Sequence, residues 1–183
     1  MLTLQFDQNA LKDKNRFELL ITDENELSGL PESARDAAAM LAKSKDKDGW
    51  LFNLSAPSYI PFMRYSDKRD LREKMYREYM SVGNKGDEFD NKDIIKKIVN
   101  IRLEIAQLMG FKNYAEYALE HTMAKNSANV YKLLNQLLEA YKPIAINEYN
   151  AVEGFALGTE KENITVMPWD WSYYSEKFRD IRF

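Results

Sequence analysis

The residues best suited to contacting a ligand lie near the end of this 183-residue chain, in the stretch PWDWSYYSEKFRD at 168–180. Four large aromatic residues stand almost side by side in this stretch, Trp169, Trp171, Tyr173 and Tyr174, with Asp170 among them. Indole and phenol rings can stack on a ligand, and tyrosine hydroxyls can form hydrogen bonds with one. The same rings also fill protein cores, so their distribution around a helix decides between the two uses.

Helical spacing divides these aromatic residues between two faces. Trp171, Tyr174 and Phe178 share one face, which we interpret as core. Trp169 and Tyr173 lie four residues apart on a different face. A helix with aromatic residues on two faces is usually buried on both sides. The alternative is that Trp169 and Tyr173 line a groove, and we retain both as candidates for contacts in a substrate cleft.

No catalytic residue and no metal ligand can be assigned from the residue types. The chain has one histidine, His121, and no cysteine, whereas a catalytic zinc site usually takes three protein ligands and often an HExxH pair. His121 is in helical register with Tyr114 and Tyr117, and we interpret it as a packed, hydrogen-bonded histidine. The sequence contains neither a GxSxG nucleophile motif nor a glycine-rich phosphate-binding motif.

Composition argues against two classes of partner. A formal net charge of -3 gives no reason to expect nucleic-acid binding, which relies on clustered Lys and Arg. No apolar run approaches the roughly 18–20 residues that span a membrane. The first residues also lack the pattern of a signal peptide.

Helical periodicity dominates the chain. In the most regular stretch, 91–108, apolar residues recur at steps of three and four, Asn91 can cap the start, and Gly110 lies where a left-handed C-cap belongs. The helix predicted at 67–82 carries Arg69, Glu73 and Arg77 at ion-pair spacing on its solvent side. The same periodicity predicts further helices at 7–17, 31–45, 113–124, 127–142 and from 168 to the end of the chain.

Prolines and polar clusters mark the breaks between these helices. Pro143 either kinks or ends the helix at 127–142. Two prolines make SAPSYIPFMRYS, 55–66, a turn or a short broken helix, and the stretches 80–91 and 154–166 are predicted loops.

Two short stretches, 16–22 and 49–55, have the length and apolar content of strands and can pair as an antiparallel ribbon. The predicted fold class is therefore mainly α. We expect a multi-helix domain with a small antiparallel β ribbon over residues 1–183.

In their order along the chain, these segments resemble the thimet oligopeptidase family of zinc metallopeptidases. The resemblance covers essentially the whole chain, and within the family it is strongest to the bacterial dipeptidyl carboxypeptidases. The segment GNKGDEFDN, 83–91, supports that preference. The most specific segments are PSY-x-P at 57–61, DLREKMY at 70–76, LMGFKNYAEYAL at 108–119 and PWDW-x-YY at 168–174.

The resemblance implies a large, mostly helical enzyme built as two halves around a deep channel. Such enzymes hydrolyse short peptides at a zinc ion held by HExxH and a downstream glutamate, and the HExxH glutamate serves as general base. Peptidyl-dipeptidases in the family release C-terminal dipeptides. HExxH is absent here, so no catalytic residue of the family can be carried onto this chain.

We therefore expect residues 1–183 to be a single segment of a zinc-dependent peptidyl-dipeptidase, upstream of its catalytic helix and inactive alone. The helix that runs without a stop signal to Phe183 agrees with a fragment. Zinc is expected in the full-length parent and not in the fragment. Tyr59, in the PSY turn, joins Trp169 and Tyr173 as a candidate for the substrate cleft.

The expected partners are short peptide substrates and the remaining catalytic half of the same chain, with neither nucleic acid nor a membrane involved. An aromatic face left bare in the fragment should favour self-association. The expected compartment is the cytoplasm. Two alternatives stay open, namely a non-catalytic helical interaction module and an oligopeptidase of the same family that cuts internally.

Overall fold

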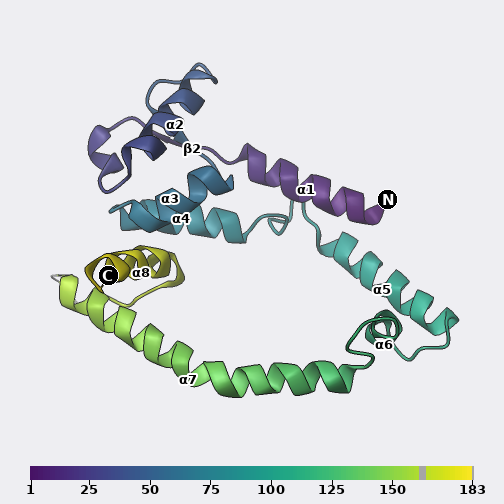
Figure 1. The fold of residues 1–183 in the computed structure, drawn as a ribbon. Coiled ribbons are helices and arrows are strands. Elements are labelled where there is room, and N and C mark those ends of the chain that lie inside the picture. Colours follow the sequence, from purple (N-terminus) through teal and green to yellow (C-terminus); the bar gives the residue numbers. More distant parts are fainter. Residues whose placement is uncertain (161–163, 183) are drawn as a thin grey trace. The chain divides into compact units, whose positions relative to one another are not determined.

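A computed structural model describes residues 1–160 and 164–182 (Figure 1). These residues form eight α-helices, one short 3-10 helix and a two-stranded sheet, which confirms the mainly helical fold class. They separate into two compact units. One unit holds Met1–Asp7 and Asn91–Asn150, and the other holds Gln8–Asp90 with the chain from Ala151 onward.

The predicted antiparallel ribbon is confirmed in the second unit. Strands β1 (Leu19–Ile21) and β2 (Trp50–Phe52) pair with Leu19 opposite Phe52 and Ile21 opposite Trp50. Helix α2 (Glu32–Lys43) packs on β2, and its small buried residues Ala38 and Ala42 allow a close approach. The ribbon and α2 therefore form one wall of the apolar core.

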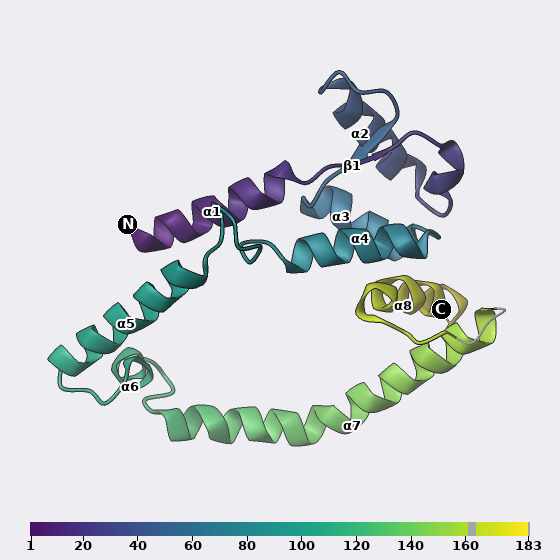
Figure 2. The same ribbon diagram turned by 180° about the vertical axis from the view of Figure 1, so that it is seen from behind.

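The opposite wall of that core is a group of three helices that lie side by side in Figure 2. Helix α8 (Pro168–Arg182) packs against both α3 (Ala56–Tyr65) and α4 (Arg69–Met80). Each of these strands and helices contributes at least one buried residue to the core between the two walls. Its buried members include Ile21, Leu27, Phe52, Leu54, Phe62, Met75 and Trp169.

Helix α3 is continuous, where the sequence predicts a turn or a broken helix at 55–66. Pro57 lies in the first turn, where a backbone N–H has no partner within the helix, so it removes no hydrogen bond. Pro61 is inside the helix and removes one. Burial of Phe62 and Met63 directly after it holds the helix together.

Helix α1 (Leu2–Arg16) starts earlier than the predicted 7–17, and its second half fastens the predicted loop at 80–91. The fully buried carboxylate of Asp13 accepts the Gly83 N–H at 2.7 Å. It also pairs with Arg16 at 2.7 Å and with Lys85 at 3.3 Å. Because a buried carboxylate requires such partners, the loop is held against the helix.

In the first unit, helix α5 (Lys92–Leu108) ends as its sequence predicts. Gly110 has a left-handed φ of 82°, the Phe111 N–H donates to the Ala106 carbonyl at 2.8 Å, and the Gly110 N–H donates to the Gln107 carbonyl at 3.0 Å. This pair of bonds is a Schellman motif. Helix α6 (Tyr114–Leu119) follows and is capped by Asn113, whose side chain accepts the Glu116 N–H at 3.0 Å.

Helix α7 (Ser127–Thr159) continues through Pro143, so of the two predicted alternatives the helix does not end there. It also includes 154–159, where the predicted start of a loop is wrong. Residues 161–163 of that predicted loop lie outside the described residues, and 164–166 have no regular structure. Val152 and Ala156 are buried against Tyr173 and Tyr174, so packing overrides the low helix propensity of Gly154 and Gly158.

Within the described ranges, no helix combines the length and the apolar character needed to cross a lipid bilayer.

Candidate functional site

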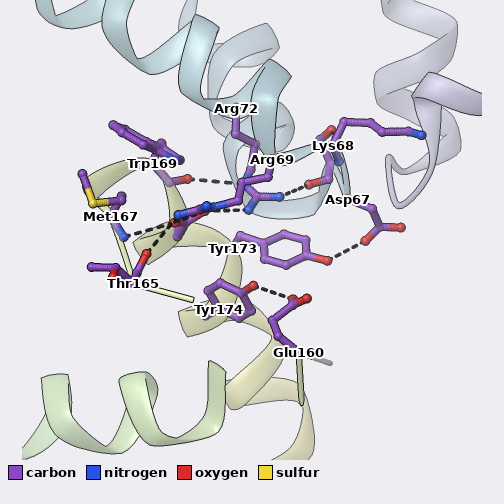
Figure 3. A network of polar contacts seen from close by, with 12 residues as sticks. Asp67, Lys68, Arg69, Arg72, Glu160, Thr165, Met167, Trp169, Tyr173 and Tyr174 are labelled. Atoms are coloured by element: carbon purple, nitrogen blue, oxygen red, sulfur yellow. Dashed lines mark hydrogen bonds and ion pairs between the residues drawn. The ribbon is translucent and has the colours of Figure 1, made fainter. Parts of the chain in front are cut away.

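The candidate site lies along helix α8 and begins at its first turn (Figure 3). Pro168 occupies the first helical position, which its fixed φ favours. Asp170, two residues later, accepts the backbone N–H of Met167 at 3.1 Å and donates its own N–H to the Met167 carbonyl at 2.8 Å. The carboxylate therefore closes the helix start and faces the positive end of the helix dipole.

Two arginines from α4 meet at this carboxylate. Arg69 contributes a planar fork, with its Nε 3.1 Å from both oxygens of Asp170 and its Nη2 2.7 Å from Oδ2. Arg72 approaches Oδ1 with Nη2 at 2.8 Å. Asp170 is fully buried and Arg72 is 1% exposed. A buried guanidinium cannot lose its proton, so the carboxylate is its obligatory counter-charge.

Arg72 also binds the backbone on both sides of this contact. Its Nη1 donates to the Ser66 carbonyl at 2.7 Å, and its Nε donates to the Trp169 carbonyl at 3.3 Å. The guanidinium carbon lies 4.0 Å from the centre of the Tyr173 ring. One side chain of α4 thereby fixes the linker before α4, the first turn of α8 and an aromatic ring one turn further along.

The electrostatics of Asp170 follow from these contacts. Burial alone would raise the pKa of this carboxyl, but the hydrogen bonds from Arg69, Met167 and Arg72 more than offset it, so the pKa lies below its ordinary value of 3.8. Asp170 is therefore ionised at neutral pH, and its charge stabilises the folded state.

A second polar cluster surrounds the hydroxyl of Tyr173. This hydroxyl donates to Asp67 Oδ1 at 2.6 Å and accepts a short hydrogen bond from the Lys177 ammonium. Ser28 donates to the other oxygen of Asp67 at 2.6 Å. Burial raises the pKa of Tyr173, and acceptance of its proton by Asp67 raises it further, so the phenol stays protonated at neutral pH.

Beside Tyr173 lies a hollow of about 380 Å³. Its lining combines the two tyrosines with an ammonium and two acids, and it comprises Phe155, Thr159, Glu160, Tyr173, Tyr174, Lys177, Asp180 and Ile181. The Tyr174 hydroxyl donates to Glu160 at 2.5 Å. Burial, followed by that hydrogen bond, raises the pKa of Tyr174. Aromatic walls with a few polar groups can hold a short peptide segment.

The three predicted cleft residues occupy different places. Tyr173 lines the hollow. Trp169 is 6% exposed within the apolar core, and Arg77 lies 4.8 Å from the centre of its ring. Tyr59 packs at the edge of the same core and stacks on Tyr79 with 4.3 Å between ring centres. Burial, followed by the nearby tyrosines, raises the pKa of Tyr59 to about 12.

Two interpretations of side-chain burial are wrong. Trp171, predicted as core, is 38% exposed, whereas Tyr173 on the other predicted face is buried. The arginines of α4 explain the difference, because they pull the Asp170 side of α8 inward. His121, predicted to be packed, has an 88% exposed side chain. Helix α6 ends at Leu119, so the helical register with Tyr114 and Tyr117 stops before His121.

Sequence reasoning missed Asp67, Arg69 and Arg72 as members of the site. The sequence predicts an ion pair between Arg69 and Glu73, yet Arg69 pairs with Asp170, 101 residues away. The other ion pair predicted from this spacing does form, with 2.7 Å between Arg77 Nε and Glu73 Oε1. The one available signal is Asp170 itself, an acid between two tryptophans in the first turn of a helix.

Across 1–160 and 164–182, no group of three or more His, Cys, Asp or Glu side chains could hold a metal ion. The residues present therefore do not fit a catalytic zinc ion, and no chemical step through zinc can be built from them.

Comparison with known proteins gives the family. The sequence profile described as "Peptidase family M3" matches residues 62–183, two thirds of the chain. The chain belongs to peptidase family M3. It is 41% identical over 182 residues to "Oligopeptidase A" of Haemophilus influenzae, an alignment that covers 96% of this chain and 26% of that protein. It thus spans about a quarter of the length of the curated relatives it matches.

Identity to other M3 peptidases varies with their type. "Oligopeptidase A" of Escherichia coli is 38% identical over 180 residues, covering 94% of this chain and 26% of that protein. "Dipeptidyl carboxypeptidase" of Escherichia coli is 28% identical over 183 residues, covering all of this chain and 27% of that protein. The predicted family relationship is confirmed at the level of M3, but these values do not support a preferential resemblance to dipeptidyl carboxypeptidases.

The buried ion pair yields a prediction about stability and pH. Replacing Asp170→Asn leaves the buried Arg72 charge without its partner and should lower the free energy of unfolding by about 3–5 kcal/mol at neutral pH. Because the folded pKa of Asp170 is lowered, its stabilising contribution is present above the ordinary pKa of 3.8 and is lost as pH falls below it. The difference in unfolding free energy between variant and wild type should therefore become smaller at about pH 3.

Urea unfolding followed by tryptophan fluorescence measures this gap at each pH. Asp36→Asn, at an exposed position of α2, is the matched control and should change the unfolding free energy by less than about 0.5 kcal/mol. Equal effects of the two substitutions at neutral pH would contradict the role given to Asp170.

Proposed function

We propose that residues 1–183 are a non-catalytic helical segment of a zinc-dependent M3 metallopeptidase that hydrolyses short peptides. The observation that carries this proposal is the family match over residues 62–183. The share of the relatives' length that the chain spans supports the proposal that the remaining family sequence holds the chemistry. With a single histidine, the 183 residues cannot contain an HExxH pair.

The exposed apolar residues of the first unit support the same proposal. Side chains on α5 and on the first half of α7 that would be buried in a complete core are exposed, among them Ile105, Leu108, Tyr131, Leu133, Leu138 and Tyr141. A helix that is apolar on several sides is normally buried in a larger protein. We assign these surfaces to contact with the rest of the peptidase, and in the isolated chain they favour self-association.

The non-catalytic interaction module is the second candidate, because the same exposed residues could cover a separate partner. The coding sequence separates the two candidates. A reading frame that continues and encodes HExxH with a downstream glutamate supports the peptidase, whereas a natural stop after Phe183 overturns it.

For the mode of cleavage, two proposals compete within the family. The sequence analysis favours release of C-terminal dipeptides, while the higher identity to relatives named oligopeptidase A favours internal cleavage. Mass spectrometry of products from one defined peptide of about ten residues distinguishes successive dipeptides from internal fragments.

The cytoplasm remains our proposed compartment. A relative named "Probable cytosolic oligopeptidase A", from Arabidopsis thaliana, is 37% identical and supports it. An organellar relative from the same plant is 36% identical, so fractionation of the source cells is the relevant test.

Expression of the full reading frame tests the proposed activity. The full-length protein should hydrolyse quenched fluorescent peptides, lose that activity with a chelator and regain it on addition of zinc, because zinc would activate the attacking water. The 183-residue chain should be inactive under the same conditions. A full-length protein that folds but shows no metal-dependent hydrolysis would contradict the proposed peptidase function.

Tyr173 is the predicted cleft residue that the hollow best supports. In the full-length protein, Tyr173→Phe removes the hydroxyl but keeps the ring on Arg72, so it should lower kcat/KM by about tenfold while folding is largely retained. Tyr65→Phe is the control, since it also removes a part-buried hydroxyl that binds a carboxylate, Glu176, at 2.7 Å outside the hollow. If both variants lose activity only in proportion to stability, Tyr173 has a structural role alone.

A further inference from the structure

A second hollow, of about 730 Å³, lies in the same unit and shares no lining residue with the one beside Tyr173. It is bounded by the 3-10 helix η1 (Glu24–Leu27) and the turn that follows it, together with Arg35 from α2 and Lys68 from the linker before α4. Two cationic side chains from separate elements thus face one polar hollow.

The wall formed by the turn is held rigidly. Gly29 has a left-handed φ of 83°, and a Cβ atom there would lie 2.1 Å from the Tyr65 carbonyl oxygen, so only glycine fits this close approach. The Asp67 N–H donates to the Ser28 carbonyl at 2.9 Å, and the Ser28 hydroxyl donates to Asp67 at 2.6 Å. These bonds fasten the turn to the linker that carries Lys68.

The two cations have no anionic partner in the described part of the chain. Neither Arg35 nor Lys68 forms an ion pair there, although most buried charged groups around α8 do. The Nε atom of Arg35 is buried and has no hydrogen-bond acceptor. Buried donors are normally satisfied in native proteins, and neither Glu24 nor Asn25, which also line the hollow, accepts this N–H. In Figure 3 the Lys68 side chain extends away from Trp169 and Met167, and the side-chain hydrogen bonds to Asp170 come from Arg69 and Arg72.

We propose that this hollow binds a carboxylate group and that, resting on the proposed peptidase function, the ligand is the free C-terminal carboxylate of a short peptide. A guanidinium presents parallel N–H donors that match a carboxylate, and a nearby ammonium adds a second positive charge. Buried Leu27 and Leu30 supply an apolar floor for an aliphatic side chain of the peptide.

The acid at the rim decides against a more highly charged ligand. Glu24 also lines the hollow, so the lining has two positive charges and one negative charge. A single carboxylate balances the net charge of +1, whereas a phosphate dianion would leave the filled hollow with a net negative charge. The same acid can receive the amino group of a short zwitterionic peptide.

Calorimetric titration of the 183-residue chain with trialanine tests the proposal without any catalysis. Trialanine should bind, and both its C-terminal amide and the Arg35→Gln variant should reduce the affinity about tenfold or more. Circular dichroism reports whether Arg35→Gln disturbs folding. Lys68→Gln should also reduce the affinity for trialanine, and it tests the site independently of Arg35. Arg64→Gln, at an exposed position of α3 outside the hollow, is the matched control and should bind as the wild type does.

Equal binding of trialanine and its amide, tighter binding of phosphate, or the same loss in Arg64→Gln would each overturn the carboxylate site. Repeating the titration with the full-length protein shows whether the hollow is still open to a peptide there. Loss of binding there would mean that a carboxylate of the same polypeptide fills the hollow, which also overturns a peptide site. Binding by the short chain without hydrolysis by the full-length protein would instead overturn the proposed function and leave the carboxylate site standing.

Discussion

The buried contact between Arg72 and Asp170 is the constraint from which the arrangement of the second unit follows. Both side chains are almost completely inaccessible, and the guanidinium cannot become neutral, so α8 must place a carboxylate where α4 places its charge. The position of the first turn of α8 then fixes, through helical spacing, where the following side chains lie. Tyr173 reaches Asp67, Tyr174 reaches Glu160, and Glu176 reaches Tyr65. Replacing such a pair by apolar residues can be neutral, so its contribution lies in specifying one arrangement of the helices.

Local features of the fold could be predicted from the sequence. The ribbon of β1 and β2 is encoded in two short apolar stretches, and the end of α5 is encoded in Gly110, because only glycine adopts a left-handed φ without cost. The capping of α6 by Asn113 likewise depends on residues three positions apart. Each of these signals acts within a few residues, and this is why a single sequence reveals it.

Features set by distant contacts could not be predicted. Glu73 lies four residues from Arg69, a spacing that suits an ion pair. Asp170 nevertheless attracts Arg69 more strongly, because opposite charges attract each other more strongly in the less polar interior than in water. Helix α7 includes Gly154 and Gly158 because Val152 and Ala156 pack on the aromatic residues of α8. Trp171 is exposed for the same reason, because the Asp170 network decides which side of α8 faces inward.

The proposed role of this segment as part of an M3 peptidase depends on the network through Tyr173, whose hydroxyl and ring are both fixed by it. A double-mutant cycle between Arg72→Met and Asp170→Asn, measured by urea unfolding of the chain at neutral pH, tests the central contact most directly. We predict that each single variant loses about 3–5 kcal/mol and that the double variant loses less than their sum by about 2 kcal/mol. Effects that add to within about 0.5 kcal/mol would show that the two side chains are not coupled and would contradict this account of the fold.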